Sequence, residues 1–300
     1  MVSIRSINKK KLIKVAFVGA MTAPAIIGFL VFYVYVNFDS IVMAFQVNDF
    51  GKLHFGFNNF SFFFNEISNP YSVFSEAILN TAIFFLLGYV AMLGSFVVAY
   101  FIYKKVFGYK FYRFIFYLPC IIMSTATSSL FYYVTRGGGP LDILYQHILG
   151  KEMPSLWNNP GSANVMLAVY TLFYGKGGNM VLFLGSMTNI SPEIFDAAKI
   201  DGVGWFREMV QIVIPLIWST LSVMILTSIT GLTQASGPVF LFTKGKYGTY
   251  TINYWLYEQL LAGVNLEISA AVGWCCTAVT FPVALLTRKV LDKIDEKVGV

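Results

Sequence analysis

The sequence contains six long runs of apolar residues, and these runs constrain the fold more than any other feature. A helix needs about 20 mostly apolar residues to cross the hydrocarbon layer of a membrane, because each residue rises about 1.5 Å. Backbone polar groups at that depth must be paired within the protein, so the runs are expected to be helices. The predicted spans cover residues 15–36, 77–103, 114–135, 163–190, 209–233 and 268–287.

The composition supports a membrane protein and excludes a soluble globule. Hydrophobic residues make up 57% of the 300 residues and charged residues only 12%, whereas charged residues are about 25% of a typical soluble chain. We therefore predict an all-α, polytopic integral membrane protein with six transmembrane helices. The three cysteines have no spacing typical of a metal site or of a disulfide framework.

Lysine and arginine are distributed unequally over the predicted loops. Fifteen of the 21 lie before the first span, after the second, after the fourth and after the sixth; five lie in the other loops, and Lys176 is inside the fourth span. By the positive-inside rule, both termini are predicted to be cytoplasmic. The net charge of +6 is then explained by orientation in membrane lipid, and no nucleic-acid partner is predicted.

This topology divides the chain into three predicted parts. Residues 1–14 form a cytoplasmic N-terminal segment, residues 15–287 a six-helix transmembrane domain, and residues 288–300 a cytoplasmic tail. The long outer loops are expected to fold as caps over the bundle, because they carry clusters of glycine and proline typical of turns. His54 and His147 lie in these loops without a second ligand at metal spacing, so we predict neither a metal site nor a catalytic residue.

The cytoplasmic loop at residues 191–208 has the pattern of a short helix with defined ends. Ser191 is a suitable N-cap, Pro192 suits the first helical position, and Gly202 can end the helix in a left-handed conformation. Judged from these residues alone, such a helix either lies at the headgroup boundary of the membrane or docks against another surface, which the small Ala197 and Ala198 would allow to approach closely.

The same loop resembles the EAA signature of ABC importer permeases, which is E-A-A, three residues, G, nine residues, I-x-L-P. The spacing is kept at every position, with Asp in place of Glu and Ile in place of Leu. The matching residues are Asp196, Ala197, Ala198, Gly202, Ile212, Ile214 and Pro215. Further stretches resemble the carbohydrate-uptake branch with its maltose- and glycerol-phosphate-type permeases, at residues 55–60, 79–81, 112–119, 249–257 and 291–295.

The resemblance covers essentially the whole chain and implies the bundle of a type I ABC importer permease in the bacterial cytoplasmic membrane. It implies a transport subunit, not an enzyme, that carries a sugar or oligosaccharide inward by alternating access. The sequence has no G-x-x-x-x-G-K-[ST] loop, so ATP and Mg²⁺ are expected in a partner and no cofactor in this chain. The implied partners are a dimeric cytoplasmic ATPase, a second homologous permease and an extracellular or periplasmic solute-binding protein.

Within this scheme, the resemblance gives the signature residues the role of coupling the chain to the ATPase. Pro215 lies where motion of the loop enters the fifth span. The substrate path is implied at the break in the fourth span and at the far end of the fifth, and its residues are Lys176, Gly178, Asn179, Ser228, Thr230, Gly231, Leu232 and Gln234.

This substrate path departs from the maltose pattern, because the expected aromatic and asparagine residues are largely Gly or Leu. A different sugar, or a site carried mainly by the partner permease, is therefore expected. Three glycines within residues 175–178 predict a helix that is either unwound or closely packed. Lys176 either snorkels, pairs with a neighbouring helix, or contacts an anionic sugar.

Two other functions stay open from the sequence. The first is a permease for phosphate, amino acids or peptides, because the loop signature is shared across those branches. The second is an intramembrane enzyme. Against the enzyme stand the lack of HExxH, GxSxG and DDxxD patterns and the single charged residue within the six predicted spans.

Overall fold

The structure is a computed structural model that describes residues 4–49, 52–234 and 237–298. The chain divides into two compact units, one of Met1–Phe64 with Asn265–Cys275 and one of Asn65–Val264 with Cys276–Val300. Helices dominate both units, and the described residues contain a single two-stranded sheet.

The first unit begins with a long helix. It runs as α1 (Ile4–Phe29), continues through the π-helical turn η1 (Leu30–Tyr35) and ends as α2 (Val36–Ala44). An antiparallel hairpin of β1 (Gln46–Asp49) and β2 (Lys52–Phe55) follows, and then α3 (Asn58–Ser68). The buried Asn59 joins these elements, because its amide donates to the carbonyls of Ala44 at 3.0 Å and Gln46 at 2.7 Å. The hairpin was not predicted from the sequence.

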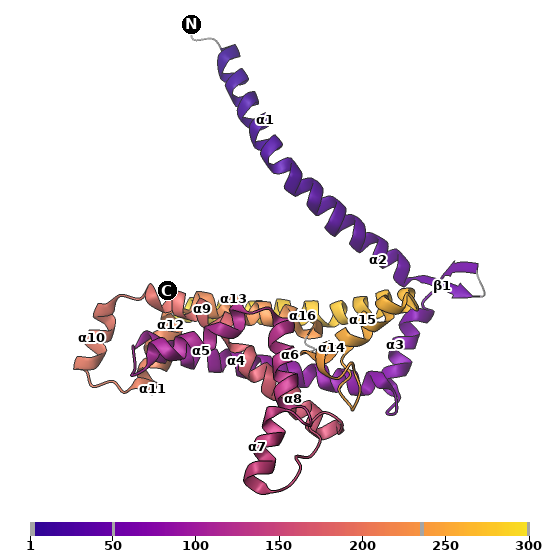
Figure 1. Cartoon of the computed structure of the whole chain (residues 1–300). Helices are drawn as coiled ribbons and strands as arrows, with labels where there is room; N and C mark the ends of the chain where they lie inside the picture. Colours follow the sequence, from indigo (N-terminus) through magenta and orange to yellow (C-terminus); the bar gives the residue numbers. More distant parts are fainter. Residues whose placement is uncertain (1–3, 50–51, 235–236, 299–300) are drawn as a thin grey trace. The chain divides into compact units, whose positions relative to one another are not determined.

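The second unit carries most of the helices (Figure 1). In chain order they are α4 (Val73–Tyr103), α5 (Tyr109–Ile121), α6 (Ser124–Thr135), α7 (Pro140–Leu149), α8 (Pro160–Tyr174), α9 (Lys176–Thr188), α10 (Pro192–Ile200), α11 (Trp205–Glu208), η2 (Met209–Val213), α12 (Ile214–Leu216), α13 (Trp218–Thr230), η3 (Leu232–Gln234), α14 (Val239–Phe242) and α15 (Ile252–Ala262). α16 (Leu266–Val298) runs through the boundary between the two units.

The described helices that could cross a membrane are fewer than the six spans expected. Over the described residues, three are long and apolar enough, Lys11–Ala44, Val73–Tyr103 and Leu266–Glu296, and two bent pairs raise the number to five. α5 and the helical stretch that begins at Ser124 are bent by 108°, and the helices on either side of Ile217 by 80°. The predicted fourth span is divided into α8 and α9.

A proline precedes each of these two bends. Pro119 lies near the end of α5 and Pro215 lies in α12. A proline has no backbone N–H and its ring displaces the carbonyl one turn earlier, so the direct effect of Pro215 falls on the preceding π-helical turn η2, and the bend at Ile217 comes after it. The sequence thus located the apolar segments and the prolines that can bend them, but not the size of the bends.

The core of the second unit forms where α4 packs along α9. Phe96 and Phe183 meet edge to face with ring centroids 5.4 Å apart, and Met180 and Met187 on the same helix as Phe183 are fully buried. Small side chains on α4, such as Ala99, let the two helices approach closely. This core sets the position of both ends of α4, which are described below.

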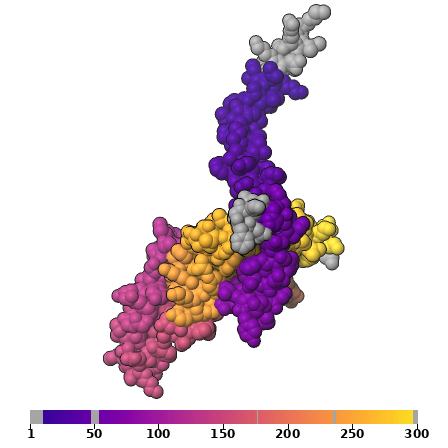
Figure 2. All heavy atoms as spheres, turned by 90° about the vertical axis from the view of Figure 1, so that its right-hand side faces the viewer, coloured from indigo at the N-terminus to yellow at the C-terminus, as the bar shows by residue number. Residues whose placement is uncertain are grey.

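At the N-terminal end of α4, polar side chains hold the segment that precedes α15. The amide of Asn80 donates to the carbonyls of Gly248 at 3.0 Å and Tyr250 at 2.8 Å, and the hydroxyl of Thr81 accepts from the N–H of Ile252 at 3.1 Å. The carbonyl of Gly248 also accepts from Asn164 at 2.8 Å. Figure 2 shows residues of this region, in orange, on the face of the second unit that is turned to the viewer.

Tyr250 belongs to the same outer layer. Its hydroxyl donates to the carboxylate of Glu258, and burial together with this bond raises the pKa of Tyr250 above its ordinary value. The carboxylate of Glu258 therefore has a hydrogen-bond partner within the chain. Asn80 and Thr81, which the sequence singled out only by resemblance, have a structural role here.

We predict that Asn80→Ala destabilises this outer layer more than Asn164→Ala does. Asn80 donates to the carbonyls of Gly248 and Tyr250, so its loss leaves the carbonyl of Tyr250 without this donor. Loss of Asn164 leaves the carbonyl of Gly248 still bonded to Asn80. Loss of a buried partner costs about 1–3 kcal/mol, so the free energy of unfolding in mixed micelles should fall by that amount for Asn80→Ala and by less for Asn164→Ala. Equal losses would contradict the assignment.

Candidate coupling loop and substrate path

The helix α10 of the candidate coupling loop has a well-formed C-terminus. Gly202 adopts φ +67°, its N–H donates to the carbonyl of Lys199 at 3.1 Å, and the N–H of Val203 donates to the carbonyl of Ala198 at 3.0 Å. This pair of bonds is the Schellman motif, which satisfies carbonyls that a helix end leaves open. The left-handed conformation is the one expected for Gly202 from the sequence.

The N-terminus of α10 differs from the expectation. Ser191 occupies the N-cap position, but its side chain accepts no hydrogen bond from the helix. Its carbonyl accepts from the N–H of Ile194 at 3.2 Å, so the first turn is closed through the backbone. Pro192 at the first helical position favours the same start, because its fixed φ suits a helix and it has no N–H to satisfy.

The two faces of α10 have different surroundings. Phe195 and Ala198 are buried, whereas Asp196 and Ala197 are exposed. The carboxylate of Asp196 lies 3.4 Å from the ammonium of Lys199, and both side chains are largely in solvent. The signature residues Asp196 and Ala197 are therefore available to a partner, while Ala198 packs within the chain.

A buried ion pair fastens the loop to the C-terminal end of α4. The ammonium of Lys104 lies 2.5 Å from a carboxylate oxygen of Glu208, which is only 4% exposed. The same carboxylate accepts from the hydroxyl of Tyr100 at 3.1 Å, and the ammonium lies 4.3 Å from the ring centre of Phe195. We call Tyr100, Lys104, Phe195 and Glu208 the loop anchor.

Aromatic contacts extend the loop anchor on both sides. Tyr103 of α4 contacts Phe195 of α10 with ring centroids 5.3 Å apart, and Phe101 contacts Trp205 of α11 at 5.6 Å. The last turn of α4 is thus bound to the helices before and after Gly202. Sequence reasoning missed this cluster because its members come from distant segments and Glu208 lies at an unspecified position of the signature, between Gly202 and Ile212.

The remaining signature residues lie where the chain leaves the loop. Ile212 is in the π-helical turn η2, and Ile214 and Pro215 are in α12, just before the 80° bend at Ile217. π-Helical turns are rare and often occur at functional sites. The described geometry therefore places Pro215 next to the bend.

A cavity of about 470 Å³ brings together several residues of the predicted substrate path. Asn179, Ser228, Gly231 and Gln234 line it, opposite a wall from α4 that includes Phe84, Phe85, Gly88, Tyr89 and Ala91. Gly178, Thr230 and Leu232 are not among its lining residues. The side chain of Lys176 lies outside the described part of the chain.

The helix break at Gly175 borders this cavity. The sequence predicted that the helix here is either unwound or closely packed, and both occur. α8 ends at Tyr174 and α9 begins at Lys176, so the interruption is at Gly175. A Cβ atom on Gly177 would lie 2.3 Å from the sulfur of Cys120 and 2.5 Å from the carbonyl oxygen of Phe116, which shows that α9 packs tightly on α5 there. Around Gly178 the space is open within 4 Å.

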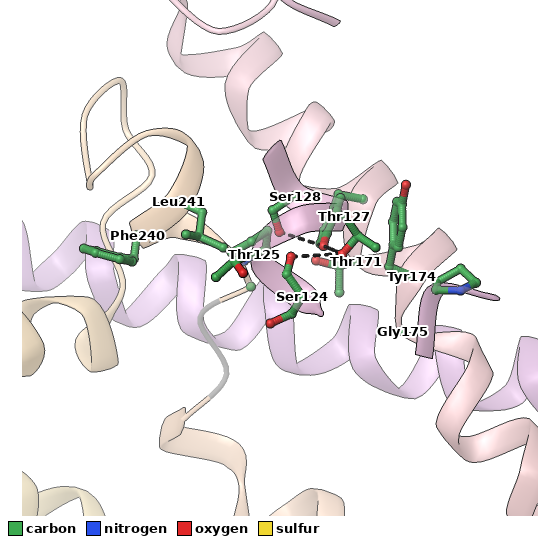
Figure 3. Close-up of a pocket in the computed structure, with 13 residues that line it drawn as sticks. Ser124, Thr125, Thr127, Ser128, Thr171, Tyr174, Gly175, Phe240 and Leu241 are labelled. Carbon is green, nitrogen blue, oxygen red and sulfur yellow. Dashed lines mark hydrogen bonds between the residues drawn. The ribbon is translucent and has the colours of Figure 1, made fainter. Parts of the chain in front are cut away.

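A second cavity, of about 570 Å³, adjoins the first and shares Thr171, Gly175 and Gly237 with it. Hydroxyl groups of α6 lie between Phe240 and Leu241 on one side and Tyr174 on the other (Figure 3). These hydroxyl residues are Ser124, Thr125, Thr127 and Ser128.

Tyr170 organises the wall of this second cavity. Its hydroxyl shares hydrogen bonds with Ser128 at 2.7 Å and Thr127 at 3.2 Å, and its ring stacks on that of Tyr174 with centroids 4.3 Å apart. Sequence reasoning missed this cavity. The signal was present as a run of hydroxyl residues at 124–128 within a predicted apolar span.

The comparisons with known proteins agree with the resemblance seen in the sequence. No protein-family model matches the chain. The chain is 28% identical over 245 residues to the lactose transport system permease protein LacF of Rhizobium radiobacter, which covers 79% of this chain and 80% of that protein. It is 24% identical to the arabinooligosaccharides transport system permease protein AraP of Bacillus subtilis, over 89% of this chain and 86% of the relative.

A solved structure shares the fold. It is the bacterial alginate ABC transporter in complex with an alginate pentasaccharide-bound periplasmic protein, with a TM-score of 0.80, 21% identity, and coverage of 95% of this chain and 97% of that one. The predicted resemblance to carbohydrate-uptake permeases of ABC importers is confirmed by these relatives, which are transport components and not enzymes.

We predict that Glu208→Ala destabilises the chain by about 1–3 kcal/mol, because it leaves the partly buried ammonium of Lys104 without its carboxylate. The matched control is Lys199→Ala, which removes the exposed pair with Asp196 and should change stability by less than about 0.5 kcal/mol. Reversible unfolding in mixed micelles measures both. If the two variants lose the same stability, the loop anchor does not hold the loop.

Proposed function

We propose that this chain, which resembles sugar permeases of ABC importers over most of its length and shares the fold of an alginate importer, is one permease subunit of an ATP-driven, binding-protein-dependent sugar importer. The observation that carries the proposal is the loop at residues 191–208. It presents Asp196 and Ala197 to solvent while the loop anchor binds it to α4.

The loop has the properties that mechanical coupling requires. A helix with satisfied ends moves as a unit, and the Schellman motif at Gly202 provides such an end. A push on Ala197 would reach α4 through Phe195 and Lys104, and the fifth span through Pro215. Closure of a partner is a known way to drive rigid-body shifts of this kind.

The two adjoining cavities support a sugar as the substrate. Their described lining residues include hydroxyls, the amides of Asn179 and Gln234, and aromatic rings, with no charged side chain among them. Hydroxyl and amide groups can exchange hydrogen bonds with the hydroxyls of a sugar, and aromatic faces can pack on its C–H groups. A permanently charged solute would find no described counter-charge in these walls.

The remaining assignments follow from the proposed role. The chain would span the bacterial cytoplasmic membrane six times as a type I permease, with its parts at residues 1–14, 15–287 and 288–300 and both termini cytoplasmic. It would work beside a second homologous permease, below a solute-binding protein and above a dimeric ATPase. ATP and Mg²⁺ would be bound by that ATPase, and this chain would hold no cofactor.

The first test addresses the coupling loop. In a chain whose three native cysteines are replaced by serine, Ala197→Cys should crosslink to a cytoplasmic ATPase subunit in membranes of the source cell, because Ala197 is exposed on α10. Lys151→Cys, which is also exposed but lies between α7 and α8, serves as the control and should give no such product. An ATPase crosslink from Lys151→Cys, or none from Ala197→Cys, would contradict the proposal.

The second test addresses the substrate path. Asn179→Ala and Gln234→Ala remove polar groups from the cavity of about 470 Å³, and each should lower uptake of the transported sugar about tenfold, since a lost hydrogen bond of about 1.4 kcal/mol is a factor of ten. Thr230→Ala is the control, because Thr230 does not line the cavity. Lys176→Ala in the same assay should impair uptake of an acidic oligosaccharide if the lysine contacts an anionic sugar; unchanged uptake would exclude that contact.

A further inference from the structure

A third cavity, of about 440 Å³, lies among the ends of α4, α5 and α9. It shares no lining residue with the two cavities of the substrate path. Two cations, Lys105 and Arg113, line it together with the tyrosines Tyr109 and Tyr117, and its described lining contains no acidic side chain. The guanidinium of Arg113 lies 5.3 Å from the ring centre of Tyr117, which favours one orientation of the arginine.

The positive charges of Lys105 and Arg113 have no carboxylate partner among the described residues, in contrast to that of the adjacent Lys104. Lys104 is neutralised by Glu208 in the loop anchor. Within residues 4–49, 52–234 and 237–298, no ion pair is formed by Lys105 or Arg113. Two positive charges that converge on one hollow without a carboxylate attract an anion, and tyrosine hydroxyls can donate hydrogen bonds to its oxygens.

The other wall of the cavity is largely apolar and belongs to α9, which lies in the fourth span predicted from the sequence. Val181 and Leu184 of α9 supply it, and Val181 is 46% exposed. An apolar surface that continues from a cationic mouth fits an amphiphile better than a free inorganic anion. Basic pockets between transmembrane helices are known to bind the headgroups of anionic lipids.

We infer that this cavity binds the phosphate headgroup of an anionic phospholipid, with the acyl chains against Val181 and Leu184. The inference does not depend on what the chain transports. Because Tyr103 lines the cavity and also contacts Phe195 of α10, a bound lipid would lie beside the loop anchor.

The test uses the full chain purified in detergent and titrated with phosphatidylglycerol, with phosphatidylcholine as the neutral lipid, followed by native mass spectrometry. We expect one phosphatidylglycerol to bind saturably and more tightly than phosphatidylcholine. Each cation near a membrane surface contributes about 1 kcal/mol, so Lys105→Ala and Arg113→Ala should each weaken this binding about fivefold and the double variant about thirtyfold. The charge-conserving Lys105→Arg and Arg113→Lys should retain it.

Lys110→Ala is the matched control, because Lys110 is an exposed cation of the same region that does not line the cavity. It should change binding less than twofold. Equal affinity for the two lipids, or an equal effect of Lys110→Ala, would overturn the inference. Displacement of the lipid by millimolar inorganic phosphate would also overturn it, because the site would then accept any soluble anion.

Discussion

The structure depends on the requirement that backbone polar groups in hydrocarbon find partners within the protein. Helices meet this requirement by themselves, and α4 does so without interruption from Val73 to Tyr103. Interruptions are tolerated only where polar surroundings replace the lost bonds. The breaks at Gly175 and Gly231 both border the cavity of about 470 Å³, and the break after α5 borders the one of about 570 Å³ through Ser124. Broken helices and cavities thus occur together at these three breaks. The bend at Ile217 differs, because it lies in the apolar core and keeps its backbone bonds, from the N–H of Ile217 to Val213 and from the N–H of Leu221 to Ile217.

The charged groups at the C-terminal end of α4 also find their partners within the protein. A buried carboxylate without a counter-charge would be costly, and Glu208 has both Lys104 and the hydroxyl of Tyr100 as partners. Apolar side chains in place of the whole cluster can give the same stability. The ion pair is therefore better explained by its effect on how α11 and α4 are aligned than by its effect on stability. The ion pair fixes which residues of α11 and α4 meet.

The sequence predicted what depends on local pattern. The apolar segments follow from composition over about 20 residues, and the left-handed end of α10 follows from Gly202 alone. The side chain of Ser191 does not cap α10, because backbone closure at Ile194 took its place. Contacts between distant segments could not be derived. Tyr100 and Glu208 are 108 residues apart, and nothing in either neighbourhood reveals the other. The bends could be located at prolines but their angles could not, since these depend on how neighbouring helices pack.

The unbroken helix α4 connects the loop, the cavity of about 470 Å³ and the outer segment of the second unit. Its 31 residues span about 45 Å at 1.5 Å per residue. Its C-terminal end holds the loop through Lys104, its middle lines the cavity of about 470 Å³ from Phe84 to Ala91, and its N-terminal end holds the outer segment through Asn80. The path along α13 crosses the bend at Ile217, whereas α9 runs from the loop to Asn179 of the cavity without a break and is interrupted only beyond it, at Gly175. A displacement of α10 would therefore reach the outer segment undiminished only along α4, while the broken helices beside it could change their angles. An unbroken helix beside bent ones is compatible with the alternating access proposed above.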